Sequence, residues 1–72
     1  MKLLPESAQG KSFIDEAELA TITGFEPQTI AKWRMIGKGP PFVRLGGYAI
    51  RYPVALVEKW LQDNLVQNDG KL

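Results

Sequence analysis

Basic side chains gather in one stretch of this 72-residue chain, and the acidic side chains lie before and after it. Between Glu26 and Glu58 the sequence contains no Asp or Glu. The cations of this interval are Lys32, Arg34, Lys38, Arg44 and Arg51. Its formal charge is therefore +5, in a chain whose total is +1. Such segregation is typical of a surface that binds a polyanion.

A short helix is expected to position the first of these cations. Pro27 suits the first position of a helix, where its missing N–H costs nothing, and Gly37 suits the position just past the end. A short amphipathic helix with one Trp is more often simply part of a core, but the charge pattern favours a binding surface here. At about 100° per residue, the side chains divide into an anchor side with Ile30, Trp33 and Gly37 and a reading side with Gln28, Lys32 and Met35.

Another helix is expected directly before this one. Asp15 and Glu18 have the spacing of a capping box, and Ile14 can pack against Leu19 as a hydrophobic staple. We expect the helix to run to about Thr23, with Ile14, Leu19, Ala20 and Ile22 buried and with Glu16 and Thr21 exposed. Gly24 then allows a tight turn into Phe25, which we expect to staple to Ile30. Two short helices joined by about three residues with a Gly are typical of a helix-turn-helix.

A hairpin is expected after the second helix, because Pro40 and Pro41 cannot continue a helix. Two β-prone runs flank Gly46-Gly47, which suits a two-residue turn. The predicted register pairs Leu45 with Tyr48, Arg44 with Ala49, Val43 with Ile50 and Phe42 with Arg51. Arg44 and Arg51 then share one face, and their guanidinium groups match phosphate oxygens. The alternative is a flap that only covers the core.

The remaining segments are predicted as follows. A core helix begins at Pro53 and runs to about Leu65, with an apolar stripe made of Pro53, Leu56, Val57, Trp60 and Leu61. Residues 1–11 are expected to be a flexible lead, in which docking of Leu3 and Leu4 on the core is left open. Residues 12–66 form one domain, and residues 67–72 are expected to be a flexible tail.

The composition bounds the chemistry. The chain has no Cys and no His, so we expect no disulfide, no metal, no other cofactor and no enzymatic activity. No apolar run reaches the roughly 18 residues of a membrane span, and the start lacks a signal-peptide core. We therefore expect a cytoplasmic protein that does not bind membranes.

The order of these motifs resembles a known family. Three stretches of sequence support the resemblance. They are Pro27-Gln28-Thr29-Ile30-Ala31-Lys32-Trp33, the block from Gly37 to Gly47, and Ile50-Arg51-Tyr52 before a helix with Trp60-Leu61. They resemble the winged helix-turn-helix proteins of the phage excisionase and AlpA group, whose fold is similar to that of MerR-type regulators. The likeness covers roughly residues 13–61, and the block from Lys38 to Gly47 is its most specific part.

The resemblance implies a small α+β winged helix-turn-helix that binds double-stranded DNA, with helix two in the major groove and the wing in the adjacent minor groove. It implies one of two roles in a bacterial or phage-infected cell. One is a recombination directionality factor that binds and bends attachment-site DNA and directs an integrase toward excision. The other is a transcriptional regulator of a phage or integrated element.

By position, the base-reading residues of the family fall on Gln28 and Lys32, the reading side given by the helix angles. Gln pairs with adenine N6 and N7, and Lys donates to guanine O6 and N7. The candidates for phosphate contacts are Thr29, Arg34, Lys38 and Arg44. The wing candidates are Gly46, Gly47, Tyr48 and Arg51. This wing is one residue longer than is common in the family, which leaves a bulge or a longer turn as an alternative.

Two kinds of partner are expected besides DNA. One is an integrase, and the other is further copies of the chain bound side by side, because one small domain covers limited DNA surface. An alternative from another class is a protein-interaction module that uses Met35, Ile36 and the wing aromatics. It predicts protein binding without a steep salt dependence of DNA affinity.

Overall fold

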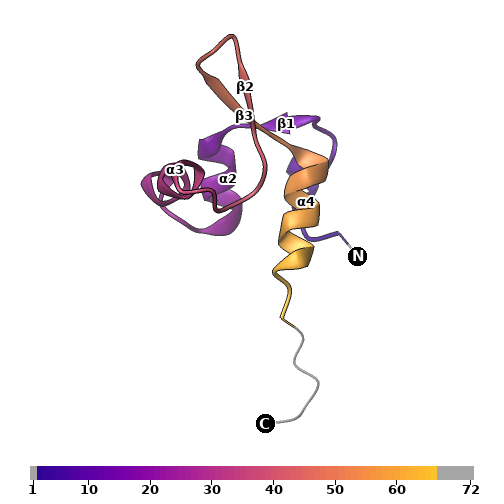
Figure 1. Cartoon of the computed structure of the whole chain (residues 1–72). Helices are drawn as coiled ribbons and strands as arrows, with labels where there is room; N and C mark the ends of the chain where they lie inside the picture. The colour runs from indigo at the N-terminus through magenta and orange to yellow at the C-terminus, as the bar shows by residue number, and fades with distance from the viewer. Residues whose placement is uncertain (1, 67–72) are drawn as a thin grey trace.

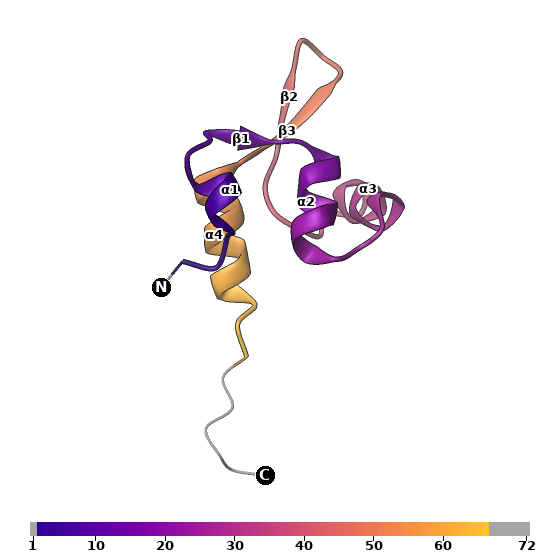
Figure 2. The same ribbon diagram turned by 180° about the vertical axis from the view of Figure 1, so that it is seen from behind.

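An antiparallel sheet of three short strands, in the order β1–β3–β2, lies between two pairs of helices (Figure 1). The structure is a computed structural model, and it describes residues 2–66. The strands are β1 (Phe13–Ile14), β2 (Val43–Leu45) and β3 (Ala49–Pro53), and the helices are α1 (Glu6–Gln9), α2 (Glu16–Thr23), α3 (Pro27–Met35) and α4 (Val54–Asp63). In Figures 1 and 2, α2 and α3 lie together on one side, α1 lies beside α4 on the other, and the β2–β3 hairpin projects away from the helices. The fold is α+β, as the sequence predicts.

Helix α2 begins at the predicted capping box. The Asp15 carboxylate accepts from the Glu18 N–H at 2.8 Å, and the Glu18 carboxylate accepts from the Asp15 N–H at 3.3 Å. Gly24 ends the helix with a left-handed φ of 79°, a conformation that favours glycine. The predicted start and end of this helix are confirmed.

Helix α3 also has the predicted ends. Pro27 is its first residue. At the other end Gly37 has a φ of 78°, and the Lys38 N–H donates to the Trp33 carbonyl at 2.7 Å. That bond across a left-handed glycine is the one found in a Schellman motif. It turns the chain out of the helix toward Pro40 and Pro41.

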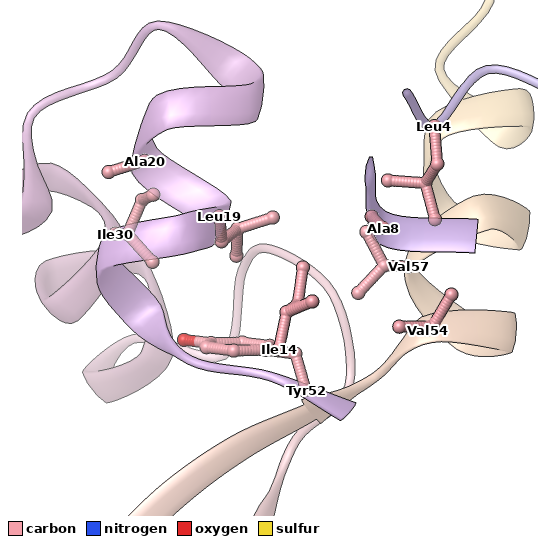
Figure 3. Close-up of a cluster of buried hydrophobic side chains, with 9 residues drawn as sticks. All are labelled: Leu4, Ala8, Ile14, Leu19, Ala20, Ile30, Tyr52, Val54 and Val57. Atoms are coloured by element: carbon pink, nitrogen blue, oxygen red, sulfur yellow. The ribbon is translucent and has the colours of Figure 1, made fainter. Parts of the chain in front are cut away.

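The hydrophobic core lies where both helical halves meet the sheet (Figure 3). Its buried members are Leu4, Ala8, Ile14, Leu19, Ala20, Ile30, Tyr52, Val54 and Val57. Tyr52 is 1% exposed, and its hydroxyl oxygen points toward the α2 and α3 half. Strand β3 therefore carries the side chain around which α2 and α3 pack.

The N-terminal segment differs from the expected flexible lead. Leu4 and Ala8 are buried in the core, and α1 lies beside α4 (Figure 2). The backbone N–H groups of Leu3 and Leu4 donate to the Glu58 carboxylate at 2.7–3.0 Å. The segment lacks a hydrophobic period because α1 is a single short turn that presents only Ala8 to the core, and Leu4 lies before it. The predicted tail, residues 67–72, lies outside the described residues.

Helix α4 differs from the prediction at its first residue and along its apolar stripe. Pro53 is the last residue of β3, not the first of the helix as predicted. Val54 and Val57 are buried, whereas Leu56 is exposed, so the predicted stripe was wrong at Leu56. Figure 3 shows Val54 and Val57 on the side of α4 that faces Leu4 and Ala8, whereas Leu56 is 41% exposed.

The Glu58 contact predicts a pH-dependent N-terminal segment. The hydrogen bond from the Leu4 N–H, helped by that from Leu3, lowers the pKa of Glu58. A carboxyl whose pKa is lower in the folded state stabilises the fold above its unfolded pKa of about 4.3, and loses this contribution as the pH falls through the folded pKa. We expect Glu58→Ala at neutral pH to lower the protection of the Leu3 and Leu4 amides against hydrogen exchange, relative to their intrinsic exchange rates at the same pH. Acidification of the native chain through the folded pKa of Glu58 should lower that protection in the same way.

The matched control is Asp63→Ala, which removes an exposed carboxylate from the same helix. It should leave the exchange of both amides unchanged. Unaltered exchange in Glu58→Ala would show that the carboxylate does not hold the segment.

Candidate nucleic-acid interface

The two sides of α3 follow the helix angles. Ile30 is 1% exposed and Trp33 is half-buried, so the side of α3 that carries them faces the core, as predicted for the anchor side. Gln28 and Lys32 are exposed, and Met35 is 83% exposed. Within residues 2–66 no hydrogen bond or ion pair engages the side chain of Gln28 or Lys32. Both base-reading candidates therefore point their polar ends into solvent.

Contacts between aromatic rings hold the anchor side in place. Phe25 meets Trp33 edge-on with ring centroids 4.7 Å apart, and Trp33 lies 6.0 Å from Trp60 of α4. Phe25, which we expected against Ile30, is thus found on the ring of Trp33. Aromatic pairs of this kind contribute about 0.5–1.5 kcal/mol beyond the area they bury. Trp33 fixes α3 against both Phe25 and α4.

Arg34 faces the interior, although the sequence suggested a phosphate contact. Its guanidinium pairs with the Glu16 carboxylate, and it lies 5.9 Å from the centre of the Phe42 ring. A hydrogen bond to the Tyr52 hydroxyl, together with the bond to Glu16, raises the pKa of Arg34. Glu16, expected to be exposed, is half-buried as the partner in this pair. Arg34 lies only about 40° from Ile30 around the helix axis, which places it on the anchor side.

The N-terminal end of α3 carries the other polar candidates. Thr29 is half-buried, and its N–H donates to the Glu26 carbonyl at 2.9 Å. Glu26 is exposed, and its side chain makes no capping bond to the helix. A carboxylate is therefore present at the same end of the helix as Gln28.

Four of the five clustered cations have no acidic partner in the part of the chain that the structure describes. The ion pairs there are Lys11–Glu18, Arg34–Glu16 and Lys59–Asp63. The cations without such a partner are Lys32, Lys38, Arg44 and Arg51. The first three of these are exposed, and Arg51 is half-buried. Uncompensated positive charge therefore runs from α3 through the following loop to the hairpin.

The register of the hairpin differs by one residue from the prediction. Val43 pairs with Arg51, Arg44 with Ile50, and Leu45 with Ala49. The turn holds three residues, because Gly46 and Gly47 are both left-handed, with φ of 62° and 85°, and Tyr48 follows before pairing resumes. The two-residue turn was wrong, and the longer turn left open by the sequence is present.

The shifted register separates the two arginines. Residues directly opposite each other in an antiparallel pair share a face, and neighbours along a strand alternate. Arg44 therefore shares the face of Ile50, and its guanidinium lies 5.9 Å from the centre of the Phe42 ring. Arg51 lies on the opposite face and donates to the Ile50 carbonyl at 2.8 Å. The prediction that both guanidinium groups share one face was wrong.

Tyr48 stands at the tip of the hairpin. It is 84% exposed, and a Cβ added at Gly46 would lie 3.6 Å from its ring. Of the aromatics proposed for the wing, Tyr52 is buried and Phe42 is half-buried. Tyr48 is the aromatic side chain that the hairpin presents to solvent.

A groove of about 830 Å³ lies between the end of α3 and α4, and the sequence did not predict it. It is lined by Ile22, Thr23, Phe25, Trp33, Gly37, Lys38, Gly39, Trp60, Leu61 and Asn64. The helical periods in the sequence indicate that Trp33 and Trp60 face inward. They do not indicate that the two side chains line a groove open to solvent. Lys38 is the charged residue of this lining.

Membrane-spanning helices and clusters of metal-ligating residues are both absent from residues 2–66. No helix in this range is long and apolar enough to cross a membrane. The same residues contain no group of three or more His, Cys, Asp or Glu placed to hold a metal. The chain matches no protein-family model and no curated protein, so its likeness to the excisionases rests on the motifs quoted above.

Proposed function

We propose that the chain is a sequence-specific, double-stranded DNA-binding protein with a winged helix-turn-helix fold. Helix α3 enters the major groove, and the β2–β3 hairpin is the wing that lies against the adjacent minor groove. The observation that carries the proposal is the solvent-facing pair Gln28 and Lys32, which lies in a region of uncompensated positive charge.

The dimensions of α3 support this placement. Its nine residues give a length of about 13 Å, and the major groove, about 12 Å wide, admits a helix. Gln28 and Lys32 are one turn apart, or about 6 Å along the axis, so they reach base pairs about two steps of 3.4 Å apart. Gln28 then pairs with an adenine edge and Lys32 donates to a guanine edge.

The cations beside α3 supply contacts that position the protein. Lys38 lies in the loop two residues after the end of α3 and its cap region, and Arg44 lies on the wing, so both reach phosphates that flank the major groove. Arg34 is withdrawn from this set because it holds α3 to Glu16 and Tyr52. Arg51 contacts DNA from the other face of the wing or serves the hairpin alone.

The role that the resemblance favours is that of an excisionase-like recombination directionality factor, with an integrase and further copies of the chain as partners on DNA. The alternative within the same class is a transcriptional regulator of a mobile element. Both roles use the same protein surface, and they differ in where the sites lie.

A protein-interaction module is the second candidate from another class. The groove beside Trp33 and Trp60 is the observation that favours it, because exposed aromatic hollows are common at sites of protein contact. A module of this kind would not need the free polar face of α3.

The test is selection of bound fragments from fragmented genomic DNA by the purified protein, at near-physiological salt, followed by sequencing. Repeated short sites beside an integrase attachment region support the directionality factor. Sites within a promoter support the regulator. Absence of any enriched sequence contradicts sequence-specific DNA binding and leaves the protein-interaction module.

A further inference from the structure

We propose that Met35 is a third base-reading residue, and that it contacts the 5-methyl group of a thymine in the major groove. This inference rests on the proposed function and specifies what α3 recognises. It assigns a role to an exposed apolar side chain that neither the core nor the rest of the site uses.

Met35 is placed in line with the two polar reading residues. Taking Gln28 as the origin, Lys32 lies at about 40° and Met35 at about −20° around the helix axis. The three side chains therefore fall within about 60° of one another, on three successive turns. Met35 is 83% exposed, so within residues 2–66 no packing explains a long apolar side chain at this position.

The spacing fits a run of base pairs. From Gln28 to Met35 the rise is about 10 Å at 1.5 Å per residue, which is about three steps of 3.4 Å along DNA. The thymine methyl is the apolar group that the major groove offers to a side chain. A flexible thioether suits this contact because it adapts to small differences in position.

The surroundings of Met35 favour DNA over an apolar protein surface. The side chains that share its face, Gln28 and Lys32, are polar, and no acidic partner neutralises Lys32 within the described chain. A protein partner held by Met35 would have to cover an uncompensated ammonium group one turn away. DNA supplies both a methyl group and guanine acceptors to the same face.

The experiment uses a DNA site obtained by the selection described above. Each thymine of the site is replaced in turn by deoxyuridine, which removes the methyl group and keeps the base-pairing edge. We expect one replacement to weaken binding of the native chain about fourfold, the equivalent of about 0.8 kcal/mol for one buried methyl. Met35→Ala should bind both versions of that site equally.

Ile36→Ala is the matched control. It also shortens an exposed apolar side chain, but Ile36 is the cap residue that follows the last residue of α3, and its backbone is no longer helical. This variant should keep the fourfold preference for thymine. Because Met35 is exposed, Met35→Ala should also keep the thermal unfolding midpoint of the native chain.

The outcomes separate this inference from the proposed function. A selected site at which no thymine methyl matters overturns the role of Met35 while DNA binding stands. Retention of the full loss on deoxyuridine by Met35→Ala also overturns that role. If selection enriches no sequence, the proposed function and this inference fail together.

Discussion

Arg34→Met should lower the free energy of unfolding by about 2–3 kcal/mol, because the guanidinium joins α3 to both α2 and β3. Its side chain is 20% exposed and pairs with the Glu16 carboxylate of α2, and the hydroxyl of the buried Tyr52 of β3 raises its pKa. A hydrogen bond to a charged group contributes about 1.5–3 kcal/mol. Met keeps the apolar stem beside Phe42, so the loss reports the polar contacts.

Urea denaturation followed by the fluorescence of Trp33 and Trp60 measures this loss. Lys32→Met, two residues earlier on the exposed side, is the control and should leave the free energy of unfolding within about 0.5 kcal/mol of the native value. Arg34→Lys should recover little, since one ammonium group lacks the planar fork of the guanidinium. Native stability in Arg34→Met, with DNA binding weakened on every sequence, would instead make Arg34 the phosphate contact that the sequence suggested.

Lys32→Ala should weaken binding to the preferred DNA site by about 1–3 kcal/mol relative to random DNA, which is the range for one base contact. Arg44→Ala should weaken binding to both DNAs alike, because phosphate contacts carry no sequence information. Lys32 is exposed and unpaired in the described structure, so neither the fold nor an internal ion pair suffers from its loss. The contrast between the two variants separates base reading from positioning.

Competition between a labelled preferred site and unlabelled random DNA measures both variants. Lys59→Ala is the control, because Lys59 pairs with Asp63 on α4 and lies outside the proposed interface. It should change neither affinity. Equal losses on the two DNAs for Lys32→Ala would remove Lys32 from base reading.

The ends of α2 and α3 were predictable because their signals are local. The Asp15–Glu18 capping box, Pro27 at the first position of α3, and the left-handed Gly37 each act within a few residues of the feature they set. The division of α3 into two sides followed from helix geometry alone. Such short-range signals fix an element without any knowledge of its neighbours.

The register of the hairpin was not predictable from Gly46-Gly47 alone. Adding Tyr48 to the turn shifts the pairing by one residue, and in a strand a shift of one residue exchanges the two faces. Arg44 and Arg51 therefore lie on opposite faces of the hairpin, not on one face as predicted. The turn conformation depends on both glycines being left-handed, which their identity permits but does not require.

The remaining differences come from contacts between residues far apart in the sequence. Arg34 and Glu16 are 18 positions apart, and Leu4 and Glu58 are 54 apart. No residue close to Arg34 in the sequence indicates that the guanidinium pairs with Glu16 of α2. No residue close to Leu4 indicates that its N–H donates to a carboxylate on α4. These partners become visible only when the helices are placed on the sheet.

The salt dependence of the affinity for double-stranded DNA tests the DNA-binding proposal most directly. With Arg34 engaged inside the fold, about three to four cations remain for phosphates, which predicts a slope of log K against log salt of roughly −2.7 to −3.6. The measurement is a titration of a labelled duplex at several salt concentrations. A slope in that range supports a DNA-binding surface along α3 and the wing, and a slope near zero contradicts it.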